Sequence, residues 1–130
     1  MYHEVFCLKE EVQNTPIIVE GKNDKRPLSK LGFNNIYTIS GQPLFYVADK
    51  ISSQHKSVVI LTDFDREGKK KAELLTKFFN SLGTKTLADI RRKFHRLFRV
   101  VKIEEMNALV ETLESNSDLT FSEKWEANLQ

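Results

Sequence analysis

Carboxylate side chains follow two separate hydrophobic segments of this sequence. Glu20 ends a run of β-branched residues over 17–20, and Asp63 and Asp65 follow a second run over 57–61. Such runs are typical of buried parallel strands, whose carboxyl ends meet at one edge of a sheet, so we expect the three side chains to share a crevice. Carboxylates that close together repel one another unless a cation lies among them, and oxygen ligands favour Mg²⁺ or Mn²⁺ over zinc. The sequence therefore predicts a metal site, with these three residues as the candidate catalytic groups.

The spacing within the second segment supports this interpretation. Asp63 and Asp65 are two positions apart, so in an extended chain they point to the same side and can share a cation. Glu67 continues the row as a further candidate metal ligand. A carboxylate at this place is also favourable in the first turn of a helix because of the helix dipole, and for Glu67 the sequence leaves both interpretations open.

Two motifs in the chain resemble those of a known family. The segments Val-Glu-Gly-Lys-Asn-Asp over 19–24 and Leu-Thr-Asp-Phe-Asp-Arg-Glu-Gly over 61–68 are similar to the two signatures of the Toprim domain, which topoisomerases, bacterial-type primases and maturation nucleases share. The similarity runs from about residue 16 to about residue 82 and is closest to small stand-alone Toprim proteins of archaea. Both motifs occur in the right order, and each follows a predicted strand.

The resemblance implies roles for individual residues. Glu20 would act as general acid or base at a phosphodiester, and Glu67 would support the metal. Asp24 matches an acid of primase-type Toprim domains, whereas topoisomerases of type IA tend to carry a basic residue there, which counts against strand passage. The motif residues expected to support the site are Gly21, Asp24 and Gly68.

The predicted elements alternate along the chain. We expect helices over 3–13, 24–31, 43–51, 69–82, 87–98 and 104–114, with strands over 17–20, 36–39, 57–61 and 99–103, and a polar tail from residue 115. This order predicts an α/β fold of the Toprim, Rossmann-like type, in which a central parallel sheet of about four strands carries helices on both faces. All 130 residues fit a single domain with its core over about 16–103.

Positive side chains are concentrated in two places. Lys22, Arg66 and Lys69 flank the acids, and a basic helix follows later in the chain, so we expect both groups to hold phosphates of DNA or RNA; ordinary solvated surface is the alternative. Phe94 and Phe98 recur at helical spacing and should anchor that helix to the core. The cations of the basic helix are Arg91, Arg92, Lys93 and Arg96.

Composition sets the remaining limits. The formal net charge of +2 is too small to argue for nucleic-acid binding by itself, and the one cysteine, Cys7, lacks partners for a disulfide or a zinc site. No segment is long and apolar enough to cross a membrane, so we expect no membrane partner and a cytoplasmic location. An amphipathic terminal helix also allows a homodimer.

The motifs therefore favour a Mg²⁺-dependent nucleic-acid-processing protein, with phosphodiester cleavage or RNA processing preferred over primer synthesis because no nucleotide-binding subdomain is evident. Whether the chain is an enzyme stays open. The alternatives are a non-catalytic DNA- or RNA-binding module, and a protein that binds nucleotides or phosphate at the same crevice.

Overall fold

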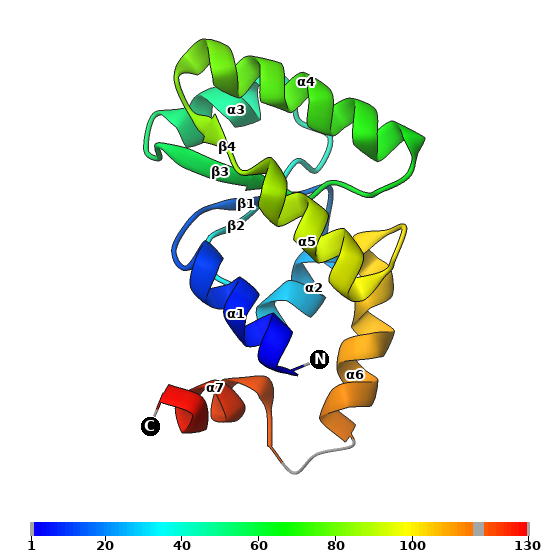
Figure 1. The fold of residues 1–130 in the computed structure, drawn as a ribbon. Coiled ribbons are helices and arrows are strands. Elements are labelled where there is room, and N and C mark those ends of the chain that lie inside the picture. Colours follow the sequence, from blue (N-terminus) through cyan, green and yellow to red (C-terminus); the bar gives the residue numbers. More distant parts are fainter. Residues whose placement is uncertain (1, 116–118, 130) are drawn as a thin grey trace.

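A four-stranded parallel sheet forms the centre of the protein (Figure 1). The computed structural model describes residues 2–115 and 119–129. The strands are β1 (Ile17–Val19), β2 (Ile36–Thr38), β3 (Ser57–Ile60) and β4 (Lys85–Thr86), in the spatial order β2-β1-β3-β4. All three pairings are parallel, and Ile18 is in register with Tyr37 of β2 and Ile60 of β3. The predicted α/β class and the parallel sheet are thus confirmed, and β3 lies in the interior of the sheet.

Helices cover both faces of the sheet, as the alternation of strands and helices predicted (Figure 1). Because successive side chains of a strand point to opposite faces, Ile17 and Val19 lie in one hydrophobic core and Ile18 in the other. The first core includes residues of α1, α2, α5, α6 and α7, and the second includes residues of α3 and α4. The helices are α1 (Tyr2–Val12), α2 (Lys22–Lys30), α3 (Leu44–Ser52), α4 (Arg66–Leu82), α5 (Ala88–Phe98), α6 (Met106–Ser115) and α7 (Phe121–Leu129).

The predicted strand over 99–103 is wrong, and β4 is the fourth strand instead. Arg99 ends α5 in the left-handed conformation, and the chain continues into a 3₁₀ helix, Ile103–Glu105. The backbone there bonds to the loop after β3, because the Phe64 N–H donates to the Val101 carbonyl at 2.6 Å. The apolar run that resembles a strand therefore packs as an irregular segment. Two residues of β4 are too few to show an alternating pattern in sequence.

A further helix lies in the tail, for which the sequence predicted only a polar segment from residue 115 onward. Residues 121–129 form α7, with Phe121 and Trp125 buried in the first core. The Trp125 indole N–H donates to the Leu31 carbonyl at 2.7 Å, which fixes α7 against the end of α2. Residues 116–118 and 130 of the predicted tail lie outside the described residues.

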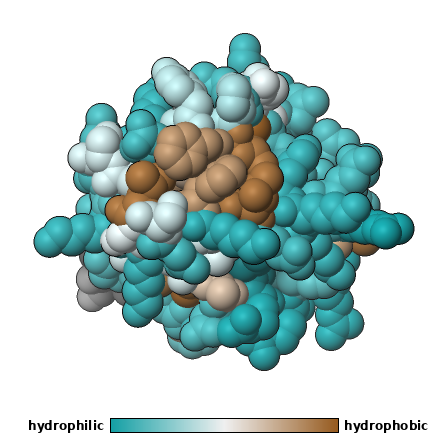
Figure 2. Space-filling view, turned by 90° about the horizontal axis from the view of Figure 1, so that it is seen from above, coloured by the Kyte–Doolittle hydropathy of each residue, from teal (hydrophilic) through white to brown (hydrophobic). Residues whose placement is uncertain are grey.

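The N-terminal helix is amphipathic as predicted, but it is packed within the chain. Val5, Leu8 and Val12 of α1 are buried in the first core. The apolar face that suggested a homodimer is therefore occupied by the protein itself, and dimerisation has no support from the structure. Hydrophobic side chains gather instead on the side of α3 and α4, seen from above in Figure 2, where Phe45 and Leu74 are exposed.

Candidate functional site

The structure brings Glu20 and Asp63 together at the carboxyl edge of the sheet. Glu20 directly follows β1, and Asp63 lies in the loop between β3 and α4. The backbone N–H of Asp63 donates to Glu20 Oε2 at 2.9 Å, so the two strand ends are joined through the acid itself. The other oxygen of the same carboxylate, Oε1, accepts from Lys71 Nζ of α4 at 2.5 Å. The site thus contains two adjacent acids and one ammonium group.

The two acids respond differently to this environment. Burial raises the pKa of Asp63 to about 6, helped by the negative charges of Glu20 and Asp24, while the Ile103 N–H, which donates to Asp63 Oδ1 at 2.8 Å, works in the opposite direction. Burial also acts to raise the pKa of Glu20, but the hydrogen bonds from Lys71 and from the Asp63 backbone outweigh it and lower that pKa. Glu20 is therefore the acid that stays ionised more readily, and Asp63 is the one whose charged form its surroundings disfavour.

Asp65 and Glu67 are placed by α4. Asp65 is the N-cap of this helix, and its Oδ1 accepts from the Gly68 N–H at 2.8 Å. Glu67 lies exposed in the first turn, where its charge favours the helix dipole. Within residues 2–115 and 119–129, no group of three or more His, Cys, Asp or Glu side chains is arranged to hold a metal ion. The structure thus pairs Glu20 with Asp63 and assigns Asp65 a capping role.

The motif residues that were expected to support the site have clear structural roles. Asp24 is buried near the start of α2 and accepts from the Gly21 N–H at 3.0 Å, which closes the turn after Glu20. Burial raises its pKa, and the charge of Glu20 adds to the effect. Gly68 packs so closely on the loop after β3 that a Cβ there would lie 2.0 Å from the Asp63 carbonyl oxygen. Only glycine allows α4 to start at this distance from Asp63.

Arg91 has a different position from the one expected of a phosphate-binding residue. Its guanidinium donates to the carbonyl oxygens of Thr62 at 2.7 Å and of Asp63 at 3.0 Å, and it lies 4.6 Å from the centre of the Phe64 ring. His95 stacks on the same ring, with a centroid distance of 4.2 Å and an interplanar angle of 8°. These contacts connect α5 to the loop that carries Asp63.

The other predicted cations lie at the surface. Of the basic helix, Lys93 is paired with Glu11 at 2.8 Å and Arg92 is paired with Asp89. The exposed cations from both predicted groups are Lys22, Arg66, Lys69, Arg92 and Arg96.

The sequence prediction missed Lys71 as a site residue. A usable signal was present, because Lys71 follows Gly68 by three positions and Ala72, Leu75 and Phe79 mark the buried face of α4. Residues three apart lie on one side of a helix, so Lys71 is directed towards the same strand end as Gly68.

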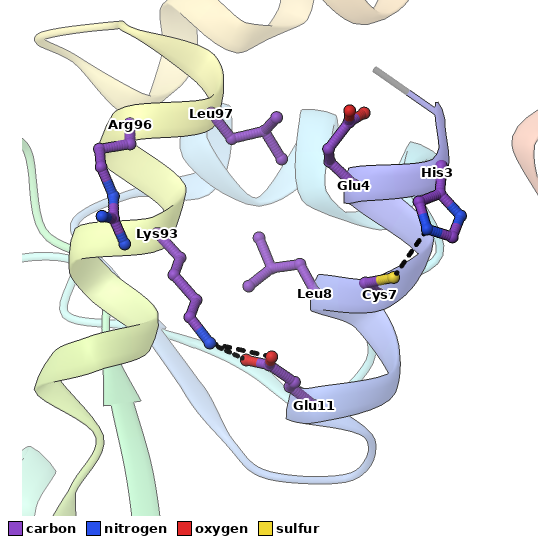
Figure 3. Close-up of a pocket in the computed structure, with 8 residues that line it drawn as sticks. All are labelled: His3, Glu4, Cys7, Leu8, Glu11, Lys93, Arg96 and Leu97. Carbon is purple, nitrogen blue, oxygen red and sulfur yellow. Dashed lines mark hydrogen bonds and ion pairs between the residues drawn. The ribbon is translucent and has the colours of Figure 1, made fainter.

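A separate pocket of about 360 Å³ lies between α1 and α5 (Figure 3). The ion pair between Lys93 and Glu11 links the two helices there, and Cys7 Sγ lies 3.6 Å from His3 Nε2. Glu20, Asp63 and Asp65 are not among the lining residues, so this pocket is distinct from the acids. It is lined by His3, Glu4, Cys7, Leu8, Glu11, Lys93, Arg96 and Leu97.

The donor set at the sheet edge fits a hard divalent cation. Mg²⁺ in proteins is usually bound by one or two carboxylates and completes its octahedron with water and substrate phosphates. Glu20 and Asp63 supply two such carboxylates from neighbouring strands. A group of three protein ligands is therefore not required.

Comparisons with known proteins identify the family and a similar fold. The Toprim domain family matches residues 15–97. The chain is 39% identical over 93 residues to UPF0292 protein MJ1624 of Methanocaldococcus jannaschii, covering 70% of each chain, and 40% identical over 94 residues to UPF0292 protein Mbar_A0484 of Methanosarcina barkeri, covering 72% of this chain and 65% of the relative. A solved structure of a protein from Aquifex aeolicus superposes with a TM-score of 0.70 at 28% identity, over 81% of this chain and 96% of the other.

From the sequence we expect no segment that could cross a membrane. No helix among the described parts of the chain is long and apolar enough to cross a bilayer.

The family match supports a general role related to metal ions and nucleic acids. With both motifs at the sheet edge and small archaeal proteins as relatives, the chain belongs to the Toprim domain family.

Proposed function

We propose that this protein is a Mg²⁺-dependent enzyme that cleaves phosphodiester bonds of DNA or RNA. The observation that supports this most strongly is the contact between Glu20 and the backbone of Asp63, which joins the acids of both motifs at one strand edge. A bound Mg²⁺ would neutralise phosphate oxygens and polarise the phosphorus centre. Glu20 and Asp63 are the residues that would hold it.

The protein's own residues supply the remaining chemistry. Glu20 keeps a low pKa, so it is present as the carboxylate that can accept a proton from the attacking oxygen and later return it to the leaving oxygen. The Asp63 N–H fixes the orientation of that carboxylate, and Lys71 pairs with it in the protein without metal. Asp65 holds the first turn of α4 and so the position of the whole loop.

Exposed cations near the motifs fit a phosphate backbone. Lys22 begins α2 directly after the first motif, and Arg66 and Lys69 lie in the first turn of α4. A backbone that approaches the acids therefore meets positive charge from both strand ends, together with the N-terminus of a 17-residue helix. Arg92, Lys93 and Arg96 would extend this contact along α5.

Cleavage of labelled single- and double-stranded DNA and RNA tests the proposal. We expect products in Mg²⁺ or Mn²⁺ with the wild type and none above background with Asp63→Asn or Glu20→Gln. Asp49→Asn, which changes an exposed aspartate of α3, is the matched control and should cleave as the wild type does. If no substrate is cut with any divalent metal, the catalytic proposal is refuted.

A second candidate is a binding module without catalysis. It is favoured by the pairing of Lys71 with Glu20, since the candidate proton acceptor already has a cation partner within the chain. This alternative expects an affinity for labelled DNA or RNA that falls steeply with salt and is unchanged in Asp63→Asn. If the protein is an enzyme, Asp63→Asn should instead abolish turnover while the substrate still binds.

A further inference from the structure

Among the described residues, Lys71 is the cation that forms an ion pair with a candidate acid. Its Nζ is 2.5 Å from Glu20 Oε1, and the side chains of Lys71 and Glu20 are 41% and 20% exposed. The hydrogen bond to Glu20 raises the pKa of Lys71, with further contributions from the charges of Glu67 and Asp63. The ammonium is thus charged and partly withdrawn from water, where an ion pair is stronger than on an open surface.

The position of Lys71 follows from the close packing of α4 on Asp63. The helix carries three successive lysines, 69 to 71, of which Lys69 and Lys70 are exposed. Lys71 lies one turn beyond Gly68, the residue in tight contact with Asp63. The helix therefore directs one cation of the three at the strand edge and leaves the others in solvent.

A divalent cation would need the same carboxylate. Glu20 Oε2 accepts from the Asp63 N–H and Oε1 accepts from Lys71 Nζ, so each oxygen of this carboxylate already has a partner within the protein. An ammonium and a divalent ion on one oxygen repel each other strongly at such short distances. The two cations would therefore compete for Glu20 Oε1.

We propose that Lys71 is a positioning residue which holds Glu20 in the metal-free protein and is displaced from it when a divalent cation binds. This inference rests on the proposed function, because it assumes that Glu20 and Asp63 are metal ligands. Its consequence is a weaker metal affinity than the two acids alone would give. In the metal-free protein Lys71 pairs with Glu20, and after metal binding its released ammonium lies beside the site.

Mn²⁺ binding, followed through the electron paramagnetic resonance signal of the free ion, tests this directly. We expect Lys71→Gln to bind Mn²⁺ about two- to fivefold more tightly than the wild type, the range that removal of a partly exposed ion pair implies. Lys71→Arg keeps a cation and should stay near the wild-type affinity. Lys70→Gln removes an adjacent exposed charge and is the matched control, with an unchanged affinity.

Thermal unfolding separates this role from a purely structural one. Without metal, Lys71→Gln should unfold at a lower temperature than the wild type, because Glu20 loses its partner. With saturating Mn²⁺ the difference in unfolding temperature should disappear, since Glu20 then binds the metal in both proteins and residue 71 no longer pairs with it. A purely structural role would leave the same difference with and without metal, and that result would overturn the inference.

The outcomes also separate this inference from the proposed function. One outcome is that the wild type binds Mn²⁺, Asp63→Asn does not, and Lys71→Gln binds Mn²⁺ with the wild-type affinity or more weakly. In that case the inference about Lys71 is wrong and the metal site stands. If the wild type and all variants bind no Mn²⁺, or if Asp63→Asn binds it unchanged, both the metal site and the role of Lys71 are refuted.

Discussion

Replacement of Gly68 by alanine tests how the second motif builds the site. Alanine inside a helix usually stabilises it by about 1 kcal/mol relative to glycine. A Cβ added at Gly68 would lie 2.0 Å from the carbonyl oxygen of Asp63, 2.5 Å from the carbonyl carbon of Asp63 and 2.9 Å from the Cα of Asp63. All three atoms belong to the backbone, so no side-chain rotation relieves the overlap, and α4 must move away from the strand end.

The cost can be estimated from these contacts. Overpacking of a protein interior typically costs about 1–3 kcal/mol, and a clash with backbone lies at the upper end. The shift would also weaken the hydrogen bond from Thr62 Oγ1 to the Gly68 carbonyl, which is 2.6 Å long, and the cap from Asp65. With the helix preference subtracted, we expect Gly68→Ala to lower the free energy of unfolding by about 2–3 kcal/mol.

Urea unfolding followed by circular dichroism measures this change. Gly21→Ala is the matched control in the first motif, because a methyl group at Gly21 would meet no heavy atom of the described residues within 4 Å, apart from its chain neighbours, and its φ of −148° suits any residue. It should cost less than about 1 kcal/mol, the usual range for a change at a helix N-cap. If Gly68→Ala is as stable as the wild type, the close approach to Asp63 is not what requires glycine.

Three further predictions concern the same loop. Asp65→Ala removes the N-cap of α4 and should lower the free energy of unfolding by about 1 kcal/mol, while Asp65→Asn should keep most of the wild-type stability. Equal urea midpoints for the two variants would refute the capping role. Arg91→Lys cannot reproduce the donations to two carbonyl oxygens and should cost about 2 kcal/mol, against less than about 0.5 kcal/mol for the exposed Arg96→Lys in the same assay. In metal-free protein the raised pKa of Asp63 gives stability that is complete below its ordinary value of 3.8 and is lost as the pH rises through about 6. The wild type should therefore lose stability over that window relative to Asp63→Asn in urea titrations at each pH, and parallel curves would contradict the shift.

Much of the fold was predictable because its signals are local. Buried strands such as β1 and β3 are continuous hydrophobic runs, and the helices repeat apolar residues every three or four positions. The strand over 99–103 failed because a β-branched run has the same composition whether its backbone bonds to a strand or to a loop. The helix α7 was missed because its two buried aromatic residues are too few to form a pattern.

The candidate site was predictable in part for a similar reason. Strand-end acids in two motifs must share the carboxyl edge of a parallel sheet, so the pairing of Glu20 with Asp63 follows from their order in the chain. The role of Arg91 was not predictable, because a guanidinium that binds backbone carbonyls and one that binds phosphate have the same sequence context. Only the packing of α5 against the loop after β3 distinguishes the two.

The sequence by itself determined the class of fold, the family and the two strand ends that carry the acids, because periodicity and motif order are properties of the chain. The tertiary structure decided which groups those acids contact. Lys71 reaches Glu20 and Ile103 donates to Asp63, since each contact depends on how a distant element packs. Hydrogen bonds and ion pairs of this kind form over a few ångströms between residues that lie far apart in sequence, and no local pattern records them.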